Sequence, residues 1–276
     1  MAINLVTKYA PKVEERFTLN SLVFGKGTAK YDFTGAKTVK SLSPTPVDLV
    51  DYDKDKVDGS RFGALTELQD EENEYTVSKD RAFNIAIDKG NNTSQLMVKA
   101  SGKMLKMEVD EKIIPELDKY ALSSYCGATG VQTSTDGALT KDNIVEKICG
   151  AVAGLVNEKV PTDDLIGWIG ATEYSKLIQT NAITYLQNEG GKAFSKGIVA
   201  ECQGVKFVRL PDSYMPTGVN FVVANRKALM PVKKINTLRI LTENPDIDGA
   251  NLQGRVMYDA FVIKQKAKGV FVSKNA

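Results

Sequence analysis

The sequence predicts an α+β fold, in which β-strands at both ends of the chain flank a long helix and a smaller α/β unit. Three observations predict this fold. Residues 83–87 alternate apolar and polar side chains, the period of a half-buried strand. Residues 92–122 repeat apolar side chains every three or four positions, the period of an amphipathic helix. Beyond residue 140, helix-like and strand-like segments follow one another, as in α/β units.

Residues 1–30 show weak periodicity and no long apolar block, so we interpret them as an extended N-terminal arm. Near its end, Gly25-Lys26-Gly27-Thr28 superficially resembles a phosphate-binding loop. It lacks the preceding glycine at the required spacing, and no helical pattern follows it. We therefore interpret these residues as a flexible linker.

Residues 31–90 are predicted to form a long β-hairpin that reaches away from the body of the protein. The outgoing strand is residues 37–42, and the returning strand, which begins to alternate near Tyr75, is clearest at residues 83–87. Between them lie residues 48–74, called here the acidic loop, with ten acidic residues against three basic ones and a local charge of −7. Such a segment cannot form a core, and connections of this length are often functional.

Residues 91–126 are predicted to form a spine helix. Pro115 lies inside the pattern, so we expect a kink or a break into two helices near Glu111. A helix of about thirty residues measures about 45 Å, which suits an element that runs along the molecule. The methionines of the stripe are interpreted as core. The stripe consists of Met97, Ala100, Met104, Met107, Ile114 and Leu117.

Residues 127–240 are predicted to form the α/β unit, and the Gly-, Ser- and Thr-rich loop 127–137 marks its boundary. Thr140 is expected to cap one helix and Thr172 another, shorter helix. Gly150 and Gly154 leave the first helix a smooth patch for another backbone. The first helix has the apolar stripe Ile144, Ile148, Val152 and Leu155, and strands are expected at 165–169, 205–210 and 219–224.

Residues 241–276 are predicted to return to the first part of the fold as strands. Val256, Tyr258, Ala260 and Val262 share one face of a strand, and Gly269 precedes a last strand at 270–272.

Composition excludes several classes of protein. The 276 residues are 42% hydrophobic and 25% charged with a net charge of +2, which gives no electrostatic reason for tight nucleic-acid binding. No apolar run is long enough to cross a bilayer, and the N-terminus lacks signal-peptide features. Histidine is absent, which removes the usual general base and the commonest transition-metal ligand. We expect no catalytic residue and no cofactor.

The three cysteines, Cys126, Cys149 and Cys202, form no CxxC pair, so we interpret them as small core residues and expect no zinc site or disulfide framework. The spacing of Asp51, Asp53 and Asp55 resembles a calcium loop. Lys56 and Phe62 occupy the positions at which that loop needs Gly and Glu. A solvated acidic loop is therefore the preferred interpretation, and no metal site is predicted.

Basic residues gather in the second half of the chain. From residue 192 to residue 239, nine Lys or Arg face two acids, a local charge of +7, and the part called here the basic face, residues 226–239, contains no acid. A solvated surface is the plain interpretation. The sharper one is that the basic face meets the acidic loop of a neighbouring subunit. The candidate contact residues are Asp51, Asp53, Asp55, Asp58, Arg61, Glu71, Glu72, Arg226, Lys227, Lys233, Lys234 and Arg239.

The order of these segments resembles that of the major capsid proteins of tailed bacteriophages with the Hong Kong 97 fold. The opening, at residues 8–17 and 31–39, is similar to capsid proteins from phages of Firmicutes. Ser60-Arg61-Phe62-Gly63 and the segments 78–83 and 87–91 are similar to the family's E-loop, and 109–118 to its spine helix. The resemblance covers nearly the whole chain and is carried mainly by the order of the phrases.

The resemblance implies an N-arm at 1–30, an E-loop at 31–90, a P-domain spine at 91–126, an A-domain at 127–240 and a return to the P-domain at 241–276. It implies pentamers and hexamers of the chain, built into an icosahedral shell that encloses double-stranded DNA without sequence specificity. A portal and a separate scaffolding protein are the implied partners, with no membrane. The implied location is the virion, and the host cytoplasm during assembly. Lys54 and Lys56 lie where some members form Lys–Asn crosslinks, but no motif identifies such a pair here.

Three alternatives remain open on the sequence. An encapsulin-like compartment subunit has the same fold and encloses cargo enzymes in place of DNA. A carboxylate-based hydrolase could use Asp163 and Asp164 or the acidic loop, and would need a concave pocket. A monomeric adhesive or structural domain from a prophage is the third.

Overall fold

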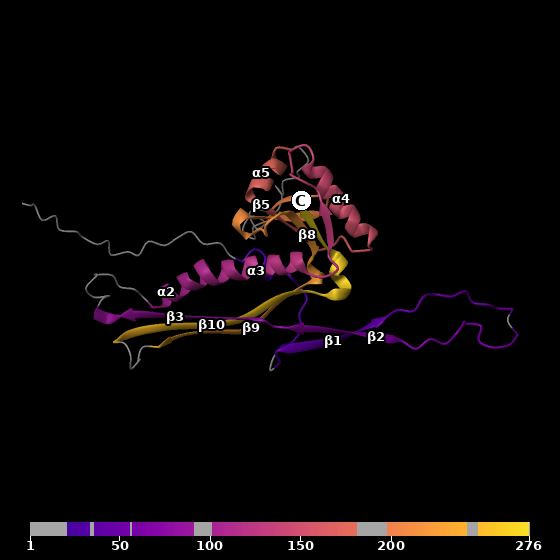
Figure 1. The fold of residues 1–276 in the computed structure, drawn as a ribbon, viewed down its shortest axis with the longest axis horizontal. Coiled ribbons are helices and arrows are strands. Elements are labelled where there is room, and N and C mark those ends of the chain that lie inside the picture. Colours follow the sequence, from indigo (N-terminus) through magenta and orange to yellow (C-terminus); the bar gives the residue numbers. More distant parts are fainter. Residues whose placement is uncertain are drawn as a thin grey trace, which may run out of the picture. The chain divides into compact units, whose positions relative to one another are not determined.

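The computed structural model describes residues 21–33, 36–55, 57–90, 101–180, 198–241 and 248–275. They form two compact units. The smaller, called here the hairpin unit, is residues 32–76, and the larger contains the rest of the described chain (Figure 1). The predicted arm before residue 21 and the first turns of the predicted spine helix, at 91–100, lie outside the described residues.

The hairpin unit is built on two antiparallel strands, β1 (Thr38–Thr45) and β2 (Gln69–Thr76), with Thr38 opposite Thr76. A hairpin was predicted, but its partner strands were wrong. The strand at 83–87 exists as part of β3 (Lys79–Asp88), which pairs with β10 (Gly249–Val262). The physical reason is that the apolar residues of β3 meet apolar residues of β10, such as Ile85 opposite Leu252, whereas polar β1 pairs with polar β2.

The larger unit contains a three-stranded antiparallel sheet in the order β3, β10, β9 (Leu229–Leu241). In β10 the predicted face of Val256, Tyr258, Ala260 and Val262 is buried, which confirms that alternation. Gly254 lies opposite Phe83, and a Cβ at this glycine would overlap the Phe83 ring. Glycine is therefore needed here to let the aromatic ring lie across the strand.

The spine consists of α2 (Ser101–Glu108), the π-helical turn η2 (Val109–Ile113) and α3 (Ile114–Gly127). The irregularity lies where a kink was predicted. Pro115 has no N–H to donate to the carbonyl four residues earlier, so the turn before it widens and Ile114 N–H donates to Val109 O.

A six-stranded mixed sheet forms the centre of the larger unit, in the order β4, β11, β8, β5, β7, β6. The predicted strands at 165–169, 205–210, 219–224 and 270–272 are all confirmed. Strands β7 and β8 follow one another in the sequence but are separated in the sheet by β5. The bounds are β4 (Gln132–Thr135), β5 (Leu165–Gly170), β6 (Ile198–Cys202), β7 (Val205–Leu210), β8 (Val219–Asn225) and β11 (Val270–Lys274).

Both faces of this sheet are covered, which is why all six residues of β5 are buried. On one face Trp168 and Val222 lie in the same core as Leu122 and Tyr125 of α3, and the Tyr125 and Trp168 rings stack with centroids 6.4 Å apart. On the other face the core includes α4 (Ile144–Asn157) and α5 (Ala171–Ile178) (Figure 1).

Details of the α/β unit differ from the prediction. In α4 the buried stripe is Ile144, Ile148, Ala151 and Leu155, so Ala151 takes the place of Val152. A side chain approaches Gly154, where a Cβ would lie 3.1 Å from Gln132 Oε1, but nothing lies within 4 Å of a Cβ at Gly150. The loop 127–137 contains β4, which pairs with β11 in parallel.

Neither predicted threonine caps its helix. Asn143 Oδ1 accepts from Thr140 N–H at the start of α4. At α5, Asp212 accepts from the Thr172 N–H, so the cap comes from another segment of the chain. A carboxylate at a helix N-terminus is favoured by the helix dipole, and hydrogen bonds from Thr172 lower the pKa of Asp212 below its usual range.

The segment 25–28 is not the flexible linker that was predicted. A Cβ at Gly27 would lie 2.5 Å from Pro231 Cδ and 2.6 Å from Leu229 O, so the backbone passes directly over β9. Thr28 N–H donates to Arg226 O at 3.0 Å. Short helical turns complete the fold: η1 (Phe24–Lys26), η3 (Asp212–Tyr214), η4 (Arg226–Ala228) and η5 (Lys264–Gly269).

Candidate functional site

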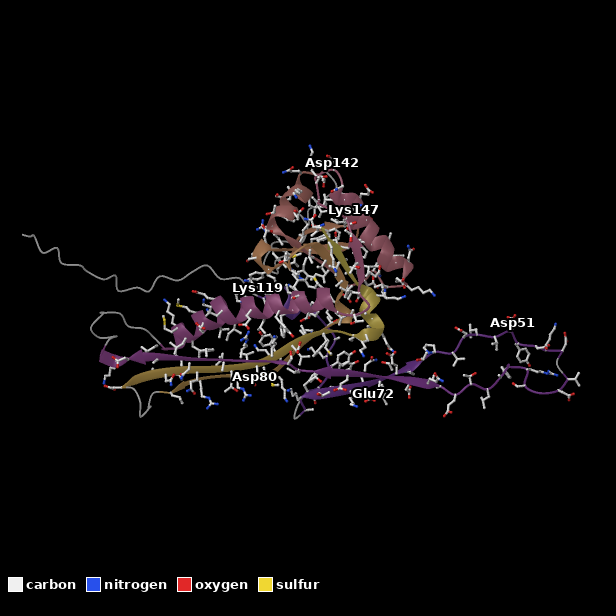
Figure 2. The ribbon with its side chains drawn as sticks, viewed as in Figure 1. Asp51, Glu72, Asp80, Lys119, Asp142 and Lys147 are labelled. Atoms are coloured by element: carbon white, nitrogen blue, oxygen red, sulfur yellow. The ribbon has the colours of Figure 1, made fainter. Side chains whose placement is uncertain are left out.

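The acidic loop exposes its charge. All ten of its acidic residues are exposed, and Asp51, Asp53, Asp55, Asp58 and Arg61 lie in the irregular segment between β1 and β2. Glu71 and Glu72 lie in β2, and Figure 2 shows Asp51 and Glu72 on this unit. Glu72 Oε1 lies 2.7 Å from Lys40 Nζ of β1, and this contact raises the pKa of Lys40. The hairpin unit therefore exposes an excess of acidic over basic side chains.

The tip of the hairpin has local order of its own. Asp53 N–H donates to Arg61 O at 3.1 Å, and Asp55 N–H donates to the Asp53 carboxylate at 3.1 Å. The Tyr52 and Phe62 rings meet edge to face with centroids 5.0 Å apart. The Asp53 carboxylate thus closes a turn, an ordinary role for aspartate in loops.

The hairpin unit also exposes large apolar side chains, a feature that the sequence analysis missed. Leu49 and Leu65 are as exposed as in an extended chain, at 101% and 102%. Such a gathering of exposed apolar groups marks an interaction surface in a soluble protein. The exposed set is Leu42, Val47, Leu49, Val50, Tyr52, Val57, Phe62, Leu65 and Leu68.

The basic face is divided by the structure into two groups. Arg226 and Lys227 lie in η4 and are already engaged: Arg226 Nε donates to Lys26 O at 2.7 Å, and Lys227 Nζ lies 3.4 Å from Asp164 Oδ2. Arg226 therefore holds the end of the N-terminal segment rather than facing solvent freely.

The second group, Lys233, Lys234 and Arg239, lies in β9. The register between β10 and β9 shifts between Met257 and Tyr258 of β10. Lys234 is the extra residue of β9 at this β-bulge. Lys233 is exposed to solvent. Neighbouring protein atoms nevertheless partly desolvate its ammonium group, and this lowers the pKa of Lys233. Arg239 is exposed beside Gly254 and Phe83, at a shallow hollow of about 400 Å³.

Two buried carboxylates fix the larger unit and were also missed. Asp118 of α3 is 1% exposed and accepts from Leu22 N–H at 2.7 Å, Phe24 N–H at 2.9 Å and Ser21 Oγ at 2.8 Å. These donors lie at and just before the start of η1, so the carboxylate docks the N-terminal segment on the spine. In the sequence, Asp118 is a single aspartate at a helix position that otherwise belongs to the apolar stripe. Periodicity alone does not show what such an aspartate does.

Asp259 of β10 is the second buried carboxylate, at 3% exposure. It accepts from Ser78 N–H at 2.8 Å and from Tyr120 Oη at 2.8 Å. Burial and this carboxylate raise the pKa of Tyr120. Hydrogen bonds to Asp118 and Asp259 thus hold the chain on both sides of the hairpin unit, at residues 21–24 and at Ser78.

The acids and cysteines considered for chemistry have the following places in the described part of the chain. No three of their Cys, Asp or Glu side chains lie close enough together to hold a metal ion. Asp163 and Asp164 are exposed on a surface turn, where Asp164 pairs with Lys227. Cys126 and Cys202 are buried and Cys149 is half-buried, and all three are free. Burial raises the pKa of the Cys126 thiol to about 12.

No helix among the described residues is both long and apolar enough to pass through a membrane.

Comparison with known proteins gives a match in structure and none in sequence. No family model and no curated protein matches the chain. A chain of Mycobacterium phage Che8 is 14% identical, with 99% of each chain covered and a TM-score of 0.74. A chain from the capsid of cyanophage P-SCSP1u is 13% identical, with 99% of this chain and 93% of that chain covered and a TM-score of 0.76. A chain from the mature capsid of bacteriophage PhiM1 is 12% identical, with 98% and 91% covered and a TM-score of 0.72. At these identities the likeness establishes the fold.

Proposed function

We propose that this chain is the major capsid protein of a tailed bacteriophage and not an enzyme. One observation carries the proposal: the chain matches three phage chains, two of them from capsids, over 98–99% of its length, with TM-scores of 0.72 to 0.76. A match over nearly the whole length means that the proposal does not depend on one domain alone. The Hong Kong 97 architecture, the five segments given above and the relationship to capsid proteins of Firmicutes phages are parts of this proposal.

In this proposal the chain assembles as pentamers and hexamers into an icosahedral head shell in the host cytoplasm and resides in the virion. Its partners are other copies of itself, a portal, a separate scaffolding protein and double-stranded DNA held without sequence specificity. A hairpin unit that exposes both charge and apolar side chains supports self-assembly, because such a surface is stabilised by a neighbouring subunit.

Within the shell, we assign the acidic loop and the basic face as contacts between subunits. Complementary charge steers and aligns association, and the hairpin unit and β9 supply the two signs. Reversal of Lys233 and Lys234 to Glu is expected to abolish shell assembly while the monomer stays folded. The pair Lys233→Gln and Lys234→Gln is the matched control, because it removes charge without reversing it.

The test is electron microscopy of the full chain, expressed alone and with the scaffolding protein from its own genome. Closed shells of uniform diameter that contain DNA after expression in the native host support the proposal. Dispersed monomers under all conditions contradict it, and shells filled with a protein cargo contradict the DNA-enclosing part. An unchanged assembly yield in the double reversal removes Lys233 and Lys234 from the contact.

A further inference from the structure

A cavity of about 330 Å³ opens in the larger unit where the end of α4 meets η4 and η5. Its floor and walls include apolar groups of Val160, Pro161 and Ala228. Four lysines stand around it, and we call this site the lysine pocket. The lysines are Lys159, Lys227, Lys266 and Lys268.

The lysine pocket has more positive charge than its own carboxylates balance. Lys268 Nζ lies 2.6 Å from Glu158 Oε2, and Lys227 pairs with Asp164. Lys159 and Lys266 are exposed at the rim and add two further cations. An apolar cavity with a cationic rim fits a ligand that offers an aliphatic side chain beside carboxylates.

The walls of the lysine pocket are fixed by hydrogen bonds. Asn225 is buried, and its Nδ2 donates to Pro161 O at 2.9 Å and to Asp163 O at 3.1 Å. Its Oδ1 accepts from Lys227 N–H at 2.9 Å, so one side chain joins two walls. A preformed pocket loses little freedom when a partner enters.

Lys159 occupies a backbone position that normally favours glycine. Its φ is 60°, and the bonds from Lys159 N–H to Val156 O and from Val160 N–H to Leu155 O close the end of α4 as a Schellman motif. A left-handed conformation is strained for a residue with a side chain and unstrained for glycine. The Lys159 side chain thus stands at the rim of the pocket, at a position where glycine would be less strained.

We propose that the lysine pocket receives the tip of the hairpin unit of a second copy of this chain. The tip offers what the pocket lacks: exposed carboxylates at Asp51 and Asp58, and fully exposed aliphatic side chains such as Leu49. The pocket volume lies at the lower end of the range for small-ligand sites, about 300–1,000 Å³, and accommodates one aliphatic side chain. This inference rests on the proposed shell function and adds three lysines outside the basic face to its contact surface.

DNA fits the lysine pocket less well than the hairpin tip does. Backbone phosphates are recognised by cations alone, and the apolar walls of a cavity contribute nothing to that contact. No exposed aromatic side chain lies among the described residues that line it, so stacking with bases is also without support.

A disulfide experiment on the full chain tests the location directly. In a Cys149→Ser background, Leu49→Cys on the tip is combined with Lys266→Cys at the pocket. Mild oxidation of assembled particles is expected to give dimers and longer disulfide-linked ladders that disappear with reductant. The control pairs Leu49→Cys with Lys141→Cys, an exposed position before α4, and is expected to give none. Shells without the Lys266 ladder overturn the docking site and leave the shell function intact, whereas dispersed chains without shells or ladder overturn both.

Charge reversal gives an independent readout. Lys159→Glu with Lys266→Glu is expected to slow assembly, followed by light scattering, about tenfold at low salt, and Lys141→Glu to leave it unchanged. Adding Asp51→Lys and Asp58→Lys is expected to restore the rate, because the complementary signs are re-established. Normal assembly of the reversed variant with loss of packaged DNA would assign the pocket to nucleic acid and contradict this proposal.

Discussion

At the scale of single residues, buried carboxylates do more than surface ion pairs to hold the larger unit together. Asp118 and Asp259 each accept several hydrogen bonds from groups far away in the sequence. The surface pairs, such as Asp80 with Arg255 at 2.6 Å, are largely exposed and contribute little to stability. Removing a buried acceptor leaves its donors without partners, and that is the larger cost.

Asp118→Asn is therefore expected to lower the free energy of unfolding by about 2–3 kcal/mol. The amide keeps the size of the side chain but presents an NH₂ group to backbone N–H donors at the start of η1. Urea unfolding followed by circular dichroism gives the measurement, with Asp142→Asn on an exposed turn as the control (Figure 2). Equal midpoints for the two variants would contradict the anchoring role.

Asp136 predicts a pH dependence. Burial by itself raises its pKa, but hydrogen bonds from Ser134 and Ser273 and the nearby Lys147 outweigh burial and hold the pKa below the usual 3.8. A depressed pKa stabilises the fold fully above the unfolded value, and this contribution disappears as the pH falls through the folded value. Asp136→Asn should therefore lose less stability than the natural chain between about pH 6 and about pH 3 in urea titrations. Parallel pH profiles for the two proteins would contradict it.

At the scale of elements, each strand pairs with a strand whose side chains fit its own in polarity and size. The three-stranded sheet depends on a close approach at Gly254, where a Cβ would also lie 2.9 Å from Leu238 Cδ2. The helix α4 carries an exposed glycine, Gly150, with open space around it. The same substitution in the two elements should thus act in opposite directions.

Gly254→Ala is expected to destabilise the chain by about 1–3 kcal/mol through overpacking, and Gly150→Ala to stabilise it by about 0.5–1 kcal/mol through helix propensity. Thermal unfolding of both variants checks the signs. In a Phe83→Ala background the cost of Gly254→Ala should shrink, because the ring that the new Cβ would overlap is gone. An unchanged cost there would show that the strain has another source.

At the scale of the whole molecule, stability and assembly are expected to depend on different units. The cores around the six-stranded sheet lie in the larger unit, whereas the hairpin unit exposes most of its large apolar side chains. Replacing residues 46–68 by a two-residue Asn-Gly turn keeps β1 and β2 but removes the exposed tip. We expect the truncated chain to unfold at nearly the same temperature and to form no shells in electron microscopy. Shells of normal yield from it would contradict the assembly role of the tip.

The sequence by itself determined the local elements and the sign of the charged surfaces. Alternation in β10, the irregularity before Pro115 and the exposed acids of the acidic loop all follow from short-range rules: side-chain period, a missing N–H and the cost of burying charge. These rules act within about ten residues, so they can be read from one sequence.

Only the tertiary structure decided which distant segments meet. Periodicity predicts that residues 83–87 form a strand but not that β10, more than 160 residues later, is its partner. In the same way, Asp118 gains its role from a segment 94–97 residues away, and the lysine pocket gathers residues from the segment after α4, from η4 and from η5. Pairing and pocket formation depend on the shape and chemistry of both partners at once, and that information appears only when the chain has folded.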